Sequence, residues 1–235
     1  MNYEIAKKVV FMNPKYQPLL TQSENYKTTK EEAMADLSIS KKELDDYSKH
    51  FPALTIGECE YMLYGARFYE FLIDNGGFLL HSSCVVYEDY AYLFSAFSGV
   101  GKSTHTNLWV KYFKGAKILN DDKPAILIEN SKIYAYGTPF SGKTDLNINA
   151  CYPIKAIIFL ERGITNEIRL LSGKEAIYNI LSQTIRPSDD KTMENLLFII
   201  NTVVKTIPIY GLKCNISDEA VELVYRTVNR KWQYE

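Results

Sequence analysis

Residues 90–109, YAYLFSAFSGVGKSTHTNLW, constrain the fold of this chain more than any other stretch. The run at 91–94 predicts a buried strand, a glycine-containing turn follows, and Lys102 to Thr104 open a predicted helix. This order of strand, glycine turn and helix is the context that a phosphate-binding P-loop requires. We therefore expect a single α/β domain organised around a phosphate site.

The glycine turn supplies the groups that a phosphate chain needs. We expect the backbone N–H groups of 98–102 to surround the phosphates, and the positive end of the helix dipole to face the same anion. Gly99 and Gly101 permit positive φ and close backbone approach. Lys102 offers a point charge to the β- and γ-phosphates, and the Ser103 hydroxyl suits Mg²⁺. The predicted nucleotide-binding residues are Ser98, Gly99, Val100, Gly101, Lys102, Ser103 and Thr104.

The loop departs from the G-x-x-x-x-G-K-[ST] pattern at one position. Ala96 stands where the first glycine is expected. The remaining run from Ser98 to Thr104 still indicates a P-loop, because an apolar strand precedes it. The alternative is an ordinary glycine turn between a strand and a helix.

Length, charge and cysteine spacing limit the classes of protein to which this chain can belong. The 235 residues suit an N-terminal elaboration of strands and helices at 1–75 and a P-loop domain at 76–235, and we expect the two to form one compact unit. A net charge of −1 argues against nucleic acid as a partner. No long apolar run or signal peptide is seen, so we expect no membrane partner and a cytoplasmic location. The four cysteines form no C-x-x-C and predict reduced thiols.

Hydrophobic periodicity and turn residues predict the remaining elements. The N-terminal part is predicted to hold strands at 3–12 and 16–22 and helices after Thr28, after Ser40 and at 58–75. The rest is predicted to hold strands at 78–87, 91–94, 117–120, 153–160, 168–171 and 207–213, hairpin turns at 88–89 and 130–131, and helices at 103–114, 172–183, 193–204 and 217–229.

An acidic pair, Asp121 and Asp122, ends the predicted strand that follows the P-loop helix. Phosphate-transfer sites use a carboxylate at this place to hold Mg²⁺ or to accept the proton of the attacking hydroxyl. Neighbouring side chains on an extended backbone point in opposite directions. One carboxylate can therefore serve the metal while the other faces the acceptor, and the sequence does not choose between them. The alternative is a surface turn.

Three features together resemble the catalytic domain of HPr kinase/phosphorylase, a fold also found in phosphoenolpyruvate carboxykinases: His81, SGVGKST at 98–104 and NDD at 120–122. The resemblance spans roughly residues 76–225 and implies an α/β fold with mixed, largely antiparallel sheets flanked by helices. It implies that Lys102 binds the β-phosphate and Ser103 the metal. It also implies that Asp122 or Asp121 is the base, with His81 nearby. A structural histidine is the alternative for His81.

The chain also departs from that family. Tyr134-Ala135-Tyr136-Gly137 stands where the family has Glu-x-Arg-Gly, so the metal-binding acid is missing. The following loop carries Lys143, which we expect to contact the transferred phosphoryl group or an anionic acceptor. Arg162 is a second candidate cation, and a salt bridge is the alternative for both. Residues 1–75 share no motif with the N-terminal domain of that family, so the resemblance does not imply HPr as the substrate.

These observations predict an ATP-dependent kinase that uses Mg²⁺ and phosphorylates a hydroxyl of a small molecule or of a serine in a peptide or protein. GTP or pyrophosphate stays open as donor. The main alternative is a nucleotide-binding switch module without phosphotransfer, and carboxykinase chemistry is a weaker one. The resemblance makes a homo-oligomer plausible. The predicted catalytic residues are Asp122, Asp121, His81, Lys102 and Lys143, and the predicted metal ligands are Ser103, Asp121 and Asp122.

Overall fold

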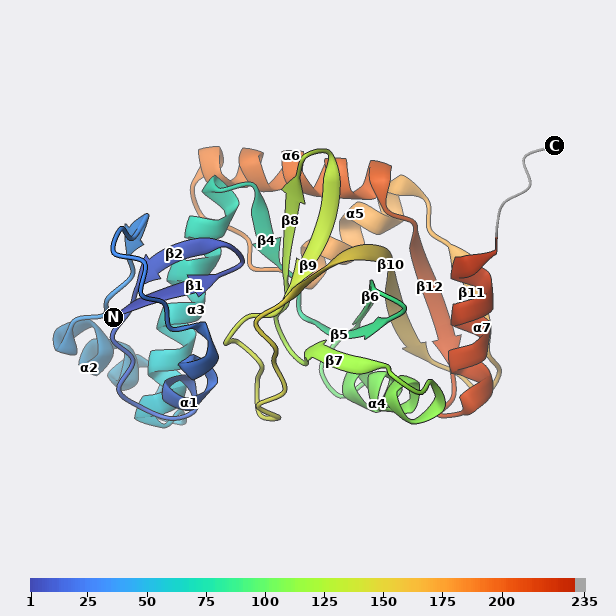
Figure 1. Ribbon diagram of the computed structural model, residues 1–235, viewed down its shortest axis with the longest axis horizontal. Helices are drawn as coiled ribbons and strands as arrows, with labels where there is room; N and C mark the ends of the chain where they lie inside the picture. Colours follow the sequence, from blue (N-terminus) through green and yellow to red (C-terminus); the bar gives the residue numbers. More distant parts are fainter. Residues whose placement is uncertain (231–235) are drawn as a thin grey trace.

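A curled sheet of nine strands forms the centre of the computed structural model, which describes residues 1–230 (Figure 1). Its main path runs β4-β8-β9-β10-β6-β5-β7, and β12 pairs with both β10 and β11. The strands are β4 (Gly77–Leu79), β5 (Ser82–Tyr87), β6 (Tyr90–Ser95), β7 (Lys117–Asn120), β8 (Ala125–Glu129), β9 (Lys132–Tyr136), β10 (Cys151–Arg162), β11 (Glu167–Leu170) and β12 (Ile209–Cys214).

Most neighbouring strands of this sheet are antiparallel. Among the described strands of this sheet, the parallel pairs are β6-β10 and β10-β12. The pairs β4-β8, β8-β9, β9-β10, β5-β6, β5-β7 and β11-β12 are antiparallel. The predicted α/β fold with mixed, largely antiparallel sheets is therefore confirmed.

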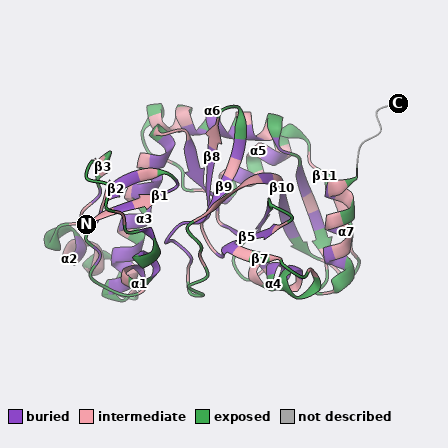
Figure 2. Cartoon of the chain, viewed as in Figure 1, coloured by how far each residue is buried: buried purple, intermediate pink, exposed green. Residues whose placement is uncertain are grey.

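Helices cover both faces of the sheet, and strand β6 shows why its sequence reads as one apolar run. Ala91 and Leu93 belong to one buried cluster, whereas Tyr92 and Phe94 belong to another. Because successive side chains point to opposite faces, a strand covered on both sides is apolar throughout. Figure 2 shows this interior as buried. The covering helices are α3 (Ile56–Asp74), α5 (Gly173–Ser182) and α6 (Asp190–Thr206) on one face, and α4 (Lys102–Tyr112) and α7 (Asp218–Asn229) on the other.

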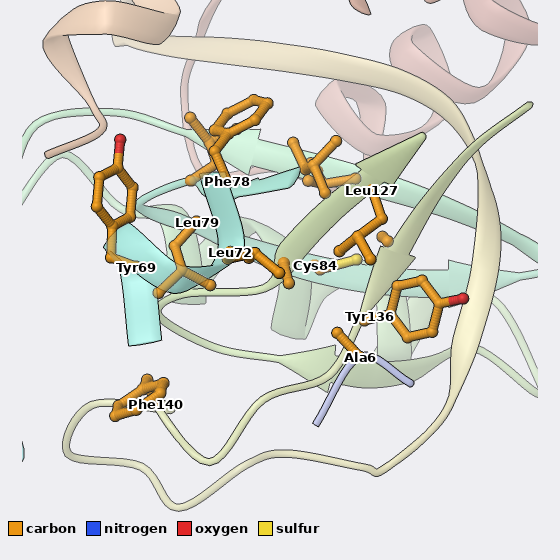
Figure 3. Close-up of a cluster of buried hydrophobic side chains, with 14 of the residues drawn as sticks. Ala6, Tyr69, Leu72, Phe78, Leu79, Cys84, Leu127, Tyr136 and Phe140 are labelled. Atoms are coloured by element: carbon orange, nitrogen blue, oxygen red, sulfur yellow. The ribbon is translucent and has the colours of Figure 1, made fainter. Parts of the chain in front are cut away.

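The N-terminal part packs on the same core as the sheet. Figure 3 shows Ala6 beside Tyr136 of β9, and both belong to one buried cluster that also holds Phe140. The predicted division at residue 76 stays a prediction. The N-terminal elements are β1 (Asn2–Ile5), β2 (Lys8–Phe11), α1 (Leu19–Gln22), a 3-10 turn η1 (Glu24–Tyr26), β3 (Ala35–Asp36) and α2 (Lys41–His50).

Three N-terminal predictions are wrong. The predicted strand at 3–12 is a hairpin of β1 and β2 that turns at Ala6 and Lys7, whose φ angles are 51° and 60°. These residue types seldom adopt positive φ, so the turn carries no glycine or asparagine signal. The predicted strand at 16–22 contains helix α1, and residues 28–34 form no helix.

The other predicted helices and strands are present, but one predicted strand is divided in two. The strand predicted at 78–87 divides at Leu80 and His81 into β4, which pairs with β8, and β5, which pairs with β6. The chain thus passes from one part of the curled sheet to another at this point. His81 lies at the break rather than within a strand.

Candidate functional site

The glycine loop and the acidic pair meet at one edge of the sheet. Strand β5 lies between β6 and β7 and is antiparallel to both, with Ser82 opposite Ser95 and Cys84 opposite Asn120. Strands β6 and β7 therefore run in the same direction, and their C-terminal ends lie at the same edge of the sheet. The loop after β6 and the aspartates after β7 face the same space for this reason.

The glycine loop leaves the N-terminus of α4 open. Gly99 and Gly101 have φ angles of 80° and 124°, which only glycine adopts readily. Gly101 is the N-cap of α4, and no side chain caps it. The other helices of ten residues or more begin with a capping side chain, from Ser40, Thr55, Ser172, Asp189 and Ser217. The free N–H groups and the dipole of α4 can therefore bind an anion.

Lys102 is folded into this loop. Its Nζ donates to the carbonyl oxygen of Ala96 at 3.0 Å, and the residue is 9% exposed. Burial lowers the pKa of Lys102, while Asp122 and Asp121 act in the opposite direction. Ala96 is not among the described residues with positive φ. Glycine is therefore not required there, which explains how the loop tolerates its departure from the motif.

Asn120 shapes the turn that carries the two aspartates. Its Oδ1 accepts from the backbone N–H groups of Asp122 at 3.1 Å and Lys123 at 2.8 Å. Its Nδ2 donates to the carbonyl oxygen of Thr138 at 2.8 Å. One buried amide thus folds the turn and ties it to the chain beyond β9.

Asp121 points toward the P-loop helix. It is 7% exposed, and its Oδ1 accepts a hydrogen bond of 2.5 Å from the Ser83 hydroxyl. The Ser83 oxygen lies 2.7 Å from Oγ1 of Thr106, on the first turns of α4. A hydroxyl pair therefore fixes this carboxylate relative to the glycine loop.

Asp122 faces a different set of groups, as expected for adjacent residues. Its Oδ1 lies 3.5 Å from Nε2 of His81, and its Oδ2 lies 3.3 Å from Nζ of Lys123. The Tyr61 hydroxyl also donates to Oδ2, at 3.4 Å. Asp122 is thus more open than Asp121 and faces an imidazole, an ammonium group and a phenol hydroxyl.

His81 is held beside Asp122 by the segment that follows α5. Its Nδ1 lies 3.1 Å from Oε1 of Gln183, and its backbone N–H donates to the carbonyl oxygen of the same residue at 2.8 Å. Burial is the main cause that lowers the pKa of His81, and Lys102 adds to it, while Asp122 opposes both. The neutral imidazole is therefore favoured near neutral pH.

These side chains line one cavity of about 360 Å³, which we call the phosphate cavity. It brings together every residue predicted to be catalytic or to bind metal, and every predicted loop residue except Val100. Val100 and Arg162 line a neighbouring space of about 410 Å³ at the ends of β10 and β12, the strand-end cavity. The phosphate cavity is lined by His81, Ser98, Gly99, Gly101, Lys102, Ser103, Thr104, Asp121, Asp122, Ser141, Gly142, Lys143 and Thr144.

Several residues of the site were not predicted from the sequence. Ser83 and Tyr61 contact the aspartates from 38 and 61 positions away, and no local motif marks either of them. Lys123 directly follows the acidic pair in the sequence, and this position is the signal that could have identified it. Arg162, proposed as a cation, donates to the carbonyl oxygens of Val100 and Gly99 instead of lining the phosphate cavity.

Other features of the described chain bear on the site's chemistry. Within residues 1–230, no group of three or more His, Cys, Asp or Glu side chains is placed to hold a metal. Tyr136, in the segment that replaces Glu-x-Arg-Gly, donates to Glu129.

The four cysteines are free thiols, as predicted. Among the helices described, none has the length and apolar character to cross a membrane.

Comparison with known proteins gives a remote likeness of fold. No family model matches the chain. No curated protein matches it either. Among solved structures, it resembles the Hpr(Ser) kinase/phosphatase from Coxiella burnetii with a TM-score of 0.38 and 11% identity, over 64% of this chain and 94% of that one.

Proposed function

We propose that this protein is an ATP-dependent kinase that transfers the γ-phosphoryl group to a hydroxyl of a small molecule or of a serine in a peptide or protein. The phosphate cavity carries this proposal, because the glycine loop, Lys102 and both aspartates line one space. Phosphoryl transfer depends mainly on positioning and charge neutralisation. The groups present are of the kind that this chemistry needs, and we expect the protein to act in the cytoplasm.

ATP would lie across two cavities. Its phosphates would bind along 98–104, and its nucleoside would occupy the strand-end cavity, which shares Gly99, Gly101 and Thr104 with the phosphate cavity. Arg162, fixed against the loop backbone, would border the nucleoside. Because backbone N–H groups bind phosphates without reading the base, competition with GTP is the test of donor choice.

Side chains of the phosphate cavity would supply the groups that the transfer requires. The acceptor oxygen attacks the γ-phosphorus, the bond to the β–γ bridging oxygen breaks, and the hydroxyl proton passes to the Asp122 carboxylate. Lys102 and Lys143 neutralise charge on the phosphates. His81 and Lys123 contact Asp122 and orient it toward the cavity.

The donor set fits Mg²⁺. Mg²⁺ prefers oxygen ligands and keeps several waters, so a few protein groups are enough. The Ser103 hydroxyl and the carboxylates of Asp121 and Asp122 line the phosphate cavity and would hold the ion. When bound, Mg²⁺ would neutralise the phosphates.

The test is transfer of label from [γ-³²P]ATP with Mg²⁺ to pooled metabolites and serine peptides. We expect label in an acceptor with the wild type. Lys102→Ala should abolish transfer by weakening ATP binding. Asp122→Asn should lower kcat by about 10²- to 10⁴-fold while ATP still binds, the usual effect of losing a general base.

A nucleotide-binding switch module is the second candidate. The replacement of the acid-bearing segment by Tyr134–Gly137 favours it. Tight ATP binding without label in any acceptor or in water would support this candidate and reject the kinase.

A further inference from the structure

A third cavity borders the phosphate cavity through residues that do not line the strand-end cavity. It measures about 740 Å³, and we call it the N-terminal cavity. It shares Gly142 and Lys143 with the phosphate cavity. Its lining comes from the α1 region, the start of α3 and one loop: Gln17, Pro18, Thr21, Gln22, Leu54, Thr55, Glu58, Tyr61, Met62, Gly142, Lys143 and Asp145.

Tyr61 forms a physical link between this cavity and Asp122. The residue lines the N-terminal cavity, and its hydroxyl donates to Oδ2 of Asp122 at 3.4 Å. The same hydroxyl accepts the backbone N–H of Gly142 at 3.1 Å. The proposed base is therefore contacted by a residue of the neighbouring cavity's wall.

Gln22 fixes the same loop from the N-terminal part. Its side chain is 3% exposed, and its Nε2 donates to the carbonyl oxygen of Gly142 at 2.9 Å. The N-terminal part thus binds the loop at both the N–H and the carbonyl group of Gly142. These two hydrogen bonds hold in place the loop that forms the shared border of the two cavities.

We propose that the N-terminal cavity binds the phosphoryl acceptor, and that this acceptor is a small amphipathic alcohol with an uncharged or cationic end. The proposal rests on the proposed kinase function and names its substrate class. Each outer cavity shares residues with the phosphate cavity, so a nucleoside, a phosphate chain and an acceptor can occupy three adjoining spaces.

The size of the cavity and the chemistry of its walls select this class. A volume of several hundred Å³ is typical of sites for small organic molecules. Pro18, Leu54 and Met62 give the apolar part of the lining. Glu58 and Asp145 give it two carboxylates, whereas its one cation, Lys143, also borders the phosphates. An anionic end would therefore be repelled, and an ammonium group would be attracted.

Transfer would join the two sites without a further co-reactant. The acceptor's hydroxyl would reach past Gly142 to Asp122, lose its proton to that carboxylate and form a new bond to the γ-phosphorus. ADP leaves with the bridging oxygen. The product is a phosphate monoester of the alcohol.

The experiment offers [γ-³²P]ATP together with a serine-peptide mixture and three alcohols of equal chain length, aminooctanol, octanol and hydroxyoctanoate, and measures the label in each. The variant Met62→Trp reduces the cavity. Met34→Trp is its matched control, because Met34 is 57% exposed, Met62 is 44% exposed, and Met34 lines none of the three cavities. Thr21→Trp reduces the cavity from another wall, so the test remains valid if Met62→Trp does not fold.

We expect wild type and Met34→Trp to label aminooctanol best and hydroxyoctanoate least. Both cavity-filling variants should raise the KM for aminooctanol at least about tenfold, and more than the KM for ATP. Label that favours hydroxyoctanoate, appears only in peptides, or is unaffected by both variants overturns this acceptor assignment and leaves the kinase standing. Absence of label in every hydroxyl compound overturns both proposals.

Discussion

A side chain at Gly142 would meet Asp122. An ideal Cβ at this position lies 3.1 Å from Cβ and 3.2 Å from Cγ of Asp122, and Gly142 has a φ of 68°. The glycine therefore allows both the left-handed turn and the close approach of the loop to the carboxylate. Asp122 keeps its place because residue 142 has no side chain.

The first prediction follows from this contact. Gly142→Ala should displace Asp122 and lower kcat at least about tenfold, while ATP affinity changes little. The left-handed φ should also cost about 1 kcal/mol of stability. Gly76→Ala is the control, since Gly76 has a φ of 81° and nothing within 4 Å of an added Cβ. Denaturant titrations and kinetics should show similar stability losses and a kinetic defect in Gly142→Ala alone. Equal kinetics in both variants would contradict the displacement.

The second prediction concerns the hydroxyl that holds Asp121. Ser83→Ala removes the 2.5 Å hydrogen bond to this carboxylate, and we expect the Mg²⁺ concentration for half-maximal activity to rise several-fold. Stability should fall by about 2 kcal/mol, as for hydrogen bonds to charged groups. Ser82→Ala is the control, because the buried Ser82 hydroxyl donates only to the Leu80 carbonyl oxygen. An unchanged Mg²⁺ requirement in Ser83→Ala would remove Asp121 from the proposed metal site.

The third prediction separates positioning from binding. Tyr61→Phe keeps the ring of the cavity wall and removes the hydroxyl that contacts Asp122 and Gly142. We expect kcat to fall about tenfold with a smaller change in the KM for the acceptor. Tyr64→Phe, on the same helix, loses a buried hydroxyl that bonds Asn13 and should lower stability alone. A pure KM effect in Tyr61→Phe would argue against a positioning role.

The fourth prediction concerns acid stability. Burial lowers the pKa of His105 to about 4, and its Nε2 accepts from Nε1 of Trp109 at 3.3 Å. The unfolded chain binds this proton below about pH 6.5, whereas the folded chain resists it down to about pH 4. Stability should therefore fall as the pH drops through this window, by at most about 3 kcal/mol from this group.

The variant His105→Gln tests this contribution, because its amide can still accept from Trp109. Denaturant titrations should show the free-energy gap between wild type and variant narrowing as the pH falls from 7 to about 4.5. The exposed His50 supplies the control variant His50→Gln, which should leave the acid dependence of wild type unaltered. A gap that stays constant with pH would show that His105 does not contribute.

Local patterns predicted most of the elements, since their physical causes are local. The helices α2 and α3 begin at capping boxes formed by Ser40 with Glu43 and Thr55 with Glu58. The hairpin of β8 and β9 turns at Asn130 and Ser131, as predicted. The glycine loop was recognisable because the positive φ angles at residues 99 and 101 require glycine at these positions of the sequence.

Contacts that depend on sheet order could not be predicted in this way. Tyr61 meets Asp122 only because α3 packs beside the loop after β9, and nothing near Tyr61 in the sequence marks this contact. The hairpin at Ala6 and Lys7 was missed because packing, rather than residue preference, sets its positive φ angles. The N-terminal cavity escaped prediction for the same reason, since it exists only after three distant segments meet.

Gly142 and Lys143 lie between two cavities whose other residues come mostly from different parts of the sequence. The glycine loop and the aspartates come from residues 98–122, whereas most of the N-terminal cavity comes from residues 17–62. Substitutions in the earlier segments can change the shape of the N-terminal cavity while the glycine loop keeps its sequence. Under the proposed kinase function, a lineage of such proteins would gain new acceptors through substitutions in its first quarter and keep the residues proposed to bind ATP.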